Sequence, residues 1–425
     1  MSAFKYILAI FFAAIYVCFG YFLDRENFLH LTILFGTAFA LYFFLLFATK
    51  DKKETDTLLW ISMLFRLIFI AAVPFLSDDF YRLIWDGKLA VNGFNPYLYI
   101  PFGIVQNDVS THAGLTRELY NHLNTADAYS VHPPVTQLLA ALAGWASKYN
   151  IAILAIRIPV LIAEFITIKY LRKLLDHLHL PHYHVLWYAL NPLVIVGFSG
   201  NLHLEGIMLM FVVVGIYQLT INRWAGAAVC WAMAIGTGWI PLLFFPALIK
   251  RLGAVKSVWF CLIAVFTLAV TFVPFLNAAS IHHVTANFRD YIFPAEFNAG
   301  LYHFISWTGI KNSMLVTAVI GLVLIMAIYF YRNNSWETTL KKLFFAYTVY
   351  LLIAPAVHPQ HIAVLILLSV FVQHYRYAML WSVLIICSYS VNVMQQQNYL
   401  PIAIEYIMVS GWMGVELYRS KKLSD

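Results

Sequence analysis

The stretch SDDFYRLIWDGKLAVNGFNPY, residues 77–97, follows directly on the apolar run TLLWISMLFRLIFIAAVPFL, residues 57–76. The apolar run is long enough to cross a membrane, and two adjacent carboxylates, Asp78 and Asp79, stand at its edge. Asp86 follows a few residues later. Acids next to hydrocarbon cost free energy, so their position needs a structural or a functional reason.

The composition places the chain in a membrane. Apolar residues make up 62% of the 425 residues and charged residues only 11%. In a soluble domain, roughly a quarter of all residues are charged. Apolar runs of about 20 residues follow one another along the chain. The net charge of +7 comes from Lys and Arg in short loops, so no nucleic-acid partner is expected. The four Cys residues lie inside apolar runs and show neither a disulfide framework nor zinc-ligand spacing.

The apolar runs predict an all-α, polytopic transmembrane protein that forms a single domain over residues 1–425. Two segments are exceptions: 133–147 is short for a span, and 224–249, with GTGWIP in its middle, predicts two half-helices that dip into the membrane and return. About twelve spans are expected, near 4–23, 28–49, 57–76, 151–172, 183–200, 203–221, 256–276, 312–331, 340–357, 361–375, 377–394 and 400–418. The first two spans form an N-terminal hairpin within residues 1–56.

The distribution of basic residues predicts the orientation. With both termini in the cytoplasm, most of the 27 Lys and Arg residues fall in inner loops, as the positive-inside rule requires. Residues 77–132 and 277–311 then form two long outer loops. The opening acids therefore face the outer side of a plasma (inner) membrane.

Most of the unusual polar residues map to this outer face, although they are distant in sequence. They are Asp78, Asp79, Arg82, Asp86, Asn95, His132, Asn201, His203, Glu205, Arg289, Asn298, His358 and His361. A shared face favours one functional site, because each acid near hydrocarbon has to offset a cost.

Each of these residues also has a structural interpretation. Asp78 follows Ser77 where a helix would begin, so it is a candidate helix N-cap. Arg82 and Asp86 are spaced i,i+4 and would form a modest helix-stabilising pair. His132 precedes two prolines that suit a rigid helix start. His203 and Glu205 are two residues apart, which does not suit one helical face and argues against a zinc site.

Arg157 and Glu164 lie seven residues apart on one face of a predicted span. A structural interpretation pairs them with each other or with the backbone, which would offset their desolvation. A functional interpretation makes Arg157, which lies nearer the outer face, a contact for an anion.

The same segments resemble a known family. Residues 77–97 are similar to the first-loop motif of polyprenol-phosphate-mannose-dependent mannosyltransferases of the GT-C fold, in which an Asp precedes an aromatic pair, an Asp-Gly and a Gly-x-Asn-Pro-Tyr. Four further segments resemble family motifs in the same order: HPPVTQLL (132–139), NPLVIVGFSGNLHLEG (191–206), AEFNAGLYHFISW (295–307) and LLIAPAVHPQHIAVLILL (351–368). The chain departs from the family pattern at four places: His132 replaces a Tyr, Glu205 an Asp, Gln360-His361 a Trp-Tyr, and Gly238 a Lys.

The resemblance implies an inverting transfer of a sugar, mannose by analogy, from a polyprenyl-phosphate donor to a glycan, lipid or protein acceptor. Asp79 matches the family's loop Asp and is the expected base, with Asp78 as the second catalytic candidate. Contacts to the donor phosphate are expected from Arg82, Arg157, Arg289 and His358. Contacts to sugar or acceptor are expected from Asp86, Asn95, His132, Asn201, His203, Glu205, Asn298 and His361. No metal, no cofactor and a monomer are expected.

Three other functions fit parts of the pattern. Many spans and a pair of half-helices would suit a transporter of a polar or anionic solute, but the two halves show no internal repeat. A lipid-linked transferase for another sugar, such as arabinose, glucose or aminoarabinose, is a second alternative. A structural membrane subunit is a third.

Overall fold

The computed structural model describes residues 1–23, 27–49, 51–292, 296–331, 335–389 and 399–422, and it excludes the side chains of 287–292 and 421. Over these residues the chain is helical and contains no strand, apart from one isolated parallel bridge between Phe297 and Ala356. This confirms an all-α polytopic membrane protein. The first half contains α1 (Ala3–Tyr21), α2 (Phe28–Phe47), α3 (Lys52–Ile68), α4 (Asp79–Val91), α5 (Pro101–Ile104), α6 (Asp108–His112), α7 (Arg117–Asn121), α8 (Pro134–Gly144), α9 (Tyr149–His177), α10 (Val185–Ala189) and α11 (Pro192–Val194).

The second half continues with a π-helical turn and further helices. They are Ile195–Gly200 (the π-helical turn), α12 (Glu205–Thr220), α13 (Trp224–Thr237), α14 (Pro241–Leu252), α15 (Ala254–Phe272), α16 (Ala278–Ile292), α17 (Leu301–Trp307), α18 (Ser313–Phe330), α19 (Trp336–Ile353), α20 (Pro359–Ser369), α21 (Tyr377–Leu384) and α23 (Tyr399–Lys422). Short 3-10 turns lie at Phe69–Ala71, Pro96–Leu98, His182–His184, Val273–Phe275 and Ile385–Tyr389.

Six helices among the described residues are long and apolar enough to cross a membrane. They are α1, α2, α9, Ala254–Phe275, α18 and Tyr399–Ser420. The pair Pro192–Gly200 and Glu205–Thr220 would be a seventh if it forms one span, but it is bent by 114°. The expected count of twelve spans is therefore not confirmed.

Two apolar segments, one predicted as a span and one as a pair of half-helices, are each divided into two helices in the structure. Residues 183–200 break between α10 and α11, because Pro192 lacks a backbone N–H and the Asn191 side chain caps the new helix start at Leu193 N, 2.9 Å away. Residues 224–249 form α13 and α14, separated at Gly238–Ile240, where two half-helices are expected. Whether these two helices dip and return stays a prediction.

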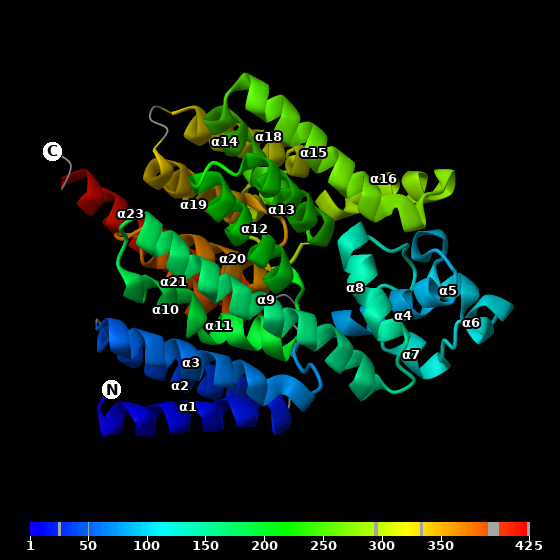
Figure 1. The fold of residues 1–425 in the computed structure, drawn as a ribbon, viewed down its shortest axis with the longest axis horizontal. Helices are drawn as coiled ribbons and strands as arrows, with labels where there is room; N and C mark the ends of the chain where they lie inside the picture. The colour runs from blue at the N-terminus through cyan, green and yellow to red at the C-terminus, as the bar shows by residue number, and fades with distance from the viewer. Residues whose placement is uncertain (24–26, 50, 293–295, 332–334, 390–398, 423–425) are drawn as a thin grey trace.

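Aromatic packing joins the N-terminal helices. Tyr16 of α1 is buried, and its ring centroid lies 5.1 Å from that of Phe65 in α3. The buried hydroxyl of Tyr42 in α2 donates a hydrogen bond to the Trp187 carbonyl, 2.9 Å away, which joins the hairpin to α10. Figure 1 shows α1, α2 and α3 side by side along one edge of the molecule. The hairpin is thus an integral part of the helical core.

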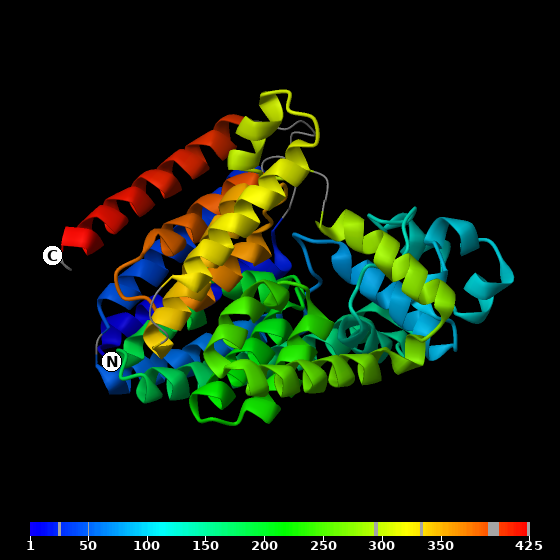
Figure 2. The same ribbon diagram turned by 90° about the horizontal axis from the view of Figure 1, so that it is seen from above.

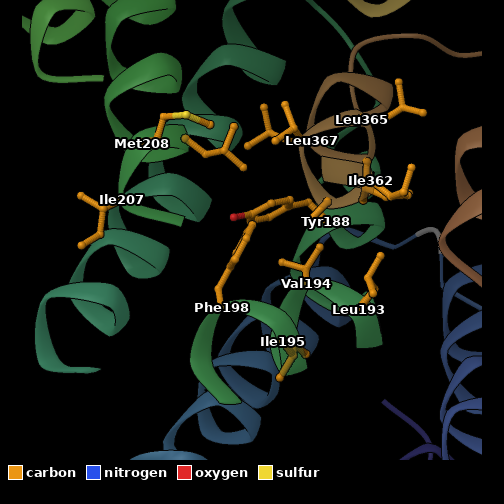
Figure 3. Close-up of a cluster of buried hydrophobic side chains, with 14 of the residues drawn as sticks. Tyr188, Leu193, Val194, Ile195, Phe198, Ile207, Met208, Ile362, Leu365 and Leu367 are labelled. Atoms are coloured by element: carbon orange, nitrogen blue, oxygen red, sulfur yellow. The ribbon is translucent and has the colours of Figure 1, made fainter. Parts of the chain in front are cut away.

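The central core lies between α12 and α20. Figure 3 shows the rings of Tyr188 and Phe198 next to each other, with Met208 of α12 and Leu367 of α20 on one side of them in this view, and all four side chains are buried. Apolar contacts of this kind hold the interrupted segment 183–200 and helix α12 against α20.

A side lobe, formed by α4 to α8, projects from the helical core (Figure 1). Helices α4 and α8 cross within it at very short range, because a Cβ atom on Gly87 would lie 2.0 Å from the Ala140 carbonyl oxygen. A Cβ on Gly144 would likewise lie 2.1 Å from the Gly87 carbonyl oxygen. Only glycine fits at both crossing points. Helix α16 lies along this lobe in both views (Figures 1 and 2).

Buried charges in the core are paired, but not as the sequence suggested. Glu164 accepts hydrogen bonds from Arg66 Nε, 2.9 Å away, and from the Tyr188 hydroxyl. Arg66 and Glu164 are both completely buried. Of the two structural alternatives for Arg157 and Glu164, the mutual pair is therefore contradicted, because Glu164 pairs with Arg66 of α3, 98 residues away.

Candidate active site

Several expected site residues meet where helices begin. Asp79 is the first residue of α4, and His132 stands just before α8. Glu205 begins α12, and His358 directly precedes α20. Asp79 lies close enough to act electrostatically on His132, Glu205 and His358. The sequence-distant polar residues thus form one cluster around Asp79, which we call the Asp79 cluster: Asp79, His132, His203, Glu205, His358 and His361.

Histidine contacts extend this cluster. His203 precedes α12 and acts electrostatically on Glu205, His358 and His361. His361 lies in the first turn of α20, and its Nδ1 accepts a hydrogen bond from the backbone N–H of His358, 3.3 Å away. Two carboxylates and several imidazoles therefore share one surface, a set that can bind sugar hydroxyls and move a proton.

Helix geometry places the acids at the start of α4. The partial positive charge of a helix N-terminus stabilises carboxylates in its first turn. Asp78 occupies the N-cap position, but its side chain makes no capping hydrogen bond. The hydroxyl of Ser77 accepts instead from the backbone N–H of Asp79, 3.3 Å away. The expectation that Asp78 caps the helix through its side chain is therefore not met.

Burial makes two histidines of the cluster hard to protonate. Desolvation is the largest influence on His132 and lowers its pKa, although Asp86 and Asp79 act in the opposite direction. Desolvation also lowers the pKa of His358, against the attraction of Asp79. Both side chains are therefore neutral imidazoles at neutral pH and can act as hydrogen-bond donors or acceptors, not as permanent cations.

The second long loop reaches this cluster through Phe297. The Phe297 ring stacks on His358, with centroids 4.5 Å apart and an interplanar angle of 14°. Its backbone pairs with the segment before α20: Phe297 N donates to the Pro355 carbonyl, and Val357 N donates to the Phe297 carbonyl. The sequence prediction named Asn298 as the site residue of this segment and not Phe297, although both lie in the family-like stretch 295–307.

Asp86 and Arg82 form a buried network next to the cluster. Asp86 is 0% exposed and accepts hydrogen bonds from Arg82 Nε at 2.9 Å, Ser130 Oγ at 2.6 Å and Gln137 Nε2 at 3.1 Å. Arg82 also donates to the carbonyl oxygens of Thr125 and Ala128. The pair thus ties α4 to the returning end of the first loop. Two atoms of this network, Nη2 of Arg82 and Oε1 of Gln137, are buried without a hydrogen-bond partner among the described residues.

Asn95 and Asn298 tie loops together and do not join the cluster's contacts. The Asn95 amide donates to the Phe275 carbonyl at 2.9 Å and to Ser280 Oγ at 2.7 Å, joining the two long loops. The buried Asn298 amide donates to Glu405 of α23, 3.2 Å away. These contacts favour a structural role over the sugar or acceptor contact expected from the sequence.

Arg157 and Asn201 clamp the two segments that lead into the cluster. Arg157 is 0% exposed and donates to the carbonyl oxygens of Ile70, Ala72, Ser199 and Gly200. The Asn201 carboxamide oxygen accepts from the backbone N–H groups of Phe75 and Leu76, at 3.2 and 2.9 Å. Arg157 is thus committed to backbone carbonyls, the structural alternative for this residue, and Asn201 is likewise committed to the backbone.

The structure does not test two expected features of the site, the phosphate contact of Arg289 and metal independence. The Arg289 side chain lies outside the described residues, so its expected phosphate contact stays a prediction. Among the residues that the structure describes, no three His, Cys, Asp or Glu side chains are grouped to hold a metal ion. Metal independence therefore also stays a prediction.

Comparison with known proteins identifies the family. The family model for the N-terminal domain of α-(1→6)-mannopyranosyltransferases matches residues 19–254, more than half of the chain. The match includes α4, α8, Arg157 and the α12 start, but ends before the second long loop. A search of curated proteins finds no match. On the family match, supported by the all-helical membrane architecture, the chain belongs to the α-(1→6)-mannopyranosyltransferase family and is a mannosyltransferase of the membrane.

Proposed function

We propose that this mannosyltransferase takes mannose from a polyprenyl-phosphate donor and transfers it, on the outer side of the membrane, to a hydroxyl of a glycan acceptor. The observation that carries the proposal is the Asp79 cluster, where an exposed carboxylate lies within electrostatic reach of Glu205, His132 and His358. A donor anchored in lipid can present its sugar at helix ends, where a soluble nucleotide sugar of the cytosol has no access.

Asp79 is the proposed general base. Its carboxylate is exposed and makes no hydrogen bond or ion pair within the described part of the chain. It would take the proton of the acceptor hydroxyl while the hydroxyl oxygen attacks the anomeric carbon of mannose. The bond from that carbon to the phosphate oxygen breaks, and its electron pair leaves with the phosphate. A single displacement inverts the anomeric centre, so an α-linked product requires a β-linked donor.

Other residues of the cluster would orient the sugar and the phosphate. Glu205 and His203 can hold sugar hydroxyls, because both lie beside Asp79 or its neighbours. His358 is proposed to donate a hydrogen bond to the leaving phosphate, since its neutral imidazole still carries one N–H. Within the described residues, Nη2 is the nitrogen of the Arg82 guanidinium that has no hydrogen-bond partner, so it is the donor that remains for a ligand. Arg289 remains a candidate for the phosphate as well.

The donor is tested with purified protein and a radiolabelled sugar. Polyprenyl-phosphate-mannose should support transfer of label to a mannosyl acceptor, whereas the glucose and arabinose analogues should not. Transfer from a nucleotide-linked mannose, with none from the lipid-linked donor, would overturn the donor proposal. Transfer of arabinose or glucose in preference to mannose would support the polyprenyl-phosphate carrier and overturn mannose as the sugar.

The orientation is tested separately by thiol labelling. Asn107 lies exposed in the first long loop, and Lys53 lies exposed at the start of α3. In a background without the four native Cys residues, Cys at 107 should react with an impermeant reagent on intact cells. Cys at 53 should react only after permeabilisation. The reverse pattern would place the Asp79 cluster on the cytoplasmic side.

A further inference from the structure

A groove lies between α3 and α9, away from the Asp79 cluster. It has a volume of about 290 Å³ and is lined by Leu59, Trp60 and Met63 of α3 and by six residues of α9: Phe165, Ile168, Lys169, Arg172, Lys173 and Asp176. Both helices present charged residues at this end: α3 begins with Lys52, Lys53 and Glu54, and α9 ends with residues 169–177. The groove uses the middle of α3, and none of the residues that line it belongs to the Asp79 cluster.

One wall of the groove is apolar and accessible. Trp60 is 66% exposed and Phe165 is 44% exposed. Their ring centroids lie 6.4 Å apart across the two helices, and Ile168 continues the same wall. Side chains of this kind at a helix surface suit contact with an acyl chain, and Trp is favoured near the membrane–water interface.

The other end of the groove is mainly cationic. Lys169, Arg172 and Lys173 line it together with a single carboxylate, Asp176. Arg172 is paired with Asp56 at 2.7 Å, but no carboxylate lies within salt-bridge distance of Lys169 or Lys173 in the described part of the chain. The ammonium of Lys173 lies 4.9 Å from the ring centroid of Tyr170 and 5.5 Å from that of Tyr217. The two lysines therefore keep their positive charge available at the rim.

We propose that this groove binds an anionic phospholipid. The phosphate lies at Lys169 and Lys173, and the acyl chain follows the wall formed by Trp60, Phe165 and Ile168. The complementarity of an apolar wall that ends at cations specifies this occupant, because a neutral lipid would leave the cations without a partner and a free anion would leave the wall unused. The site is independent of the proposed reaction and would anchor or stabilise the helical core.

Native mass spectrometry of the purified full chain tests whether the groove selects a lipid by its negative charge. Phosphatidylglycerol should be retained more strongly than phosphatidylcholine with the same acyl chains. Each lysine near a lipid headgroup contributes enough that the double variant Lys169→Gln/Lys173→Gln should bind phosphatidylglycerol about tenfold to thirtyfold more weakly. The matched variant Lys52→Gln/Lys53→Gln removes the same charge from exposed residues that do not line the groove, and it should bind as the unaltered protein does.

Three results would overturn the proposal: equal retention of both lipids, equal loss in both double variants, or complete competition by inorganic phosphate alone. Trp60→Ala tests the acyl wall and should also weaken retention of phosphatidylglycerol. Leu64→Ala is its control, since Leu64 is 60% exposed on the same helix but outside the groove. If Trp60→Ala and Leu64→Ala weaken the retention of phosphatidylglycerol equally, the apolar wall is not part of the binding site. None of these variants touches the Asp79 cluster, so mannose transfer and lipid retention can fail independently.

Discussion

Asp79 and Asp86 stand on the same helix, α4, seven residues apart, and their surroundings are opposite. Asp79 is exposed at the helix start, and its carboxylate has no hydrogen-bond partner within the described residues. Asp86 is completely buried and has Arg82, Ser130 and Gln137 as partners. The same residue type thus serves as a free carboxylate at one end of the helix and as an anchor near its middle.

The buried Asp86 fixes the helix that carries the exposed Asp79. The Asp86 network attaches α4 to residues 125–137, and the glycine crossing at Gly87 and Gly144 brings α4 against α8. These two contacts fix the position of α4, and Asp79 is thereby held within electrostatic reach of Glu205 and His358. A general base needs this preorganisation more than it needs partners of its own.

Replacing Asp79 should give the largest effect on catalysis. Asp79→Asn removes the proposed base and should lower the rate of mannose transfer by about 10² to 10⁴-fold. Because its side chain is exposed at the helix start, the melting temperature should change little. Radiolabel transfer and a thermal melt on the same preparation measure both quantities.

Asp78→Asn is the matched comparison, since it removes an adjacent carboxylate. It should leave the rate within a few-fold of the unaltered protein. A loss confined to Asp78→Asn would reassign the base to Asp78. Full activity in both single variants and in the double variant would remove both acids from catalysis and leave Glu205 as the remaining carboxylate of the Asp79 cluster.

Replacing Asp86 should give the largest effect on stability. Asp86→Leu leaves Arg82 buried without its carboxylate partner, which typically costs about 3–5 kcal/mol. Unfolding in a denaturant series should show this loss. The double variant Arg82→Met/Asp86→Leu removes the orphaned charge and should recover part of it. If Asp86→Leu melts normally but is inactive, Asp86 belongs with Asp79 in the chemistry and the contrast between the two acids is wrong.

The sequence identified which residues are unusual but not all of their partners. Local signals, such as acids at a helix start and an i,i+4 spacing, correctly predicted α4 and the Arg82–Asp86 pair. Arg66 and Glu164 are 98 residues apart, so only the tertiary fold brings them together. For the same reason the backbone carbonyls that Arg157 meets could not be predicted, because their acceptors are main-chain atoms with no sequence signature.

Asn201 should show a smaller, mixed effect, because its carboxamide holds the backbone of the segment before Asp79. Asn201→Leu removes the shared acceptor of two backbone N–H groups, those of Phe75 and Leu76. Each such group costs about 1–3 kcal/mol when it finds no other partner. Hydrogen exchange at residues 75 and 76 should accelerate, and kcat should fall more than KM rises. A change in KM alone would make Asn201 a substrate contact.

The smallest expected effect is a dependence of stability on pH that comes from His132 and His358. Burial lowers the pKa of both imidazoles below the ordinary value of 6.5. Between the lowered folded value and 6.5, the unfolded chain binds more protons, so stability falls as pH decreases below about 6.5. Above that pH the contribution is fully present, and below the folded value it levels off. Each histidine contributes a slope of at most about 1.4 kcal/mol per pH unit.

Thermal melts between pH 5 and pH 8 measure this slope. His358→Asn and His132→Gln should each flatten it, and the double variant should flatten it further. His112→Gln is the control, because His112 is exposed in the side lobe and its loss should leave the slope unchanged. An unchanged slope in the double variant would mean that neither imidazole is held neutral. The Asp79 cluster would then carry positive charge below pH 6.5, and His358 would meet the leaving phosphate as a cation and not as a neutral donor.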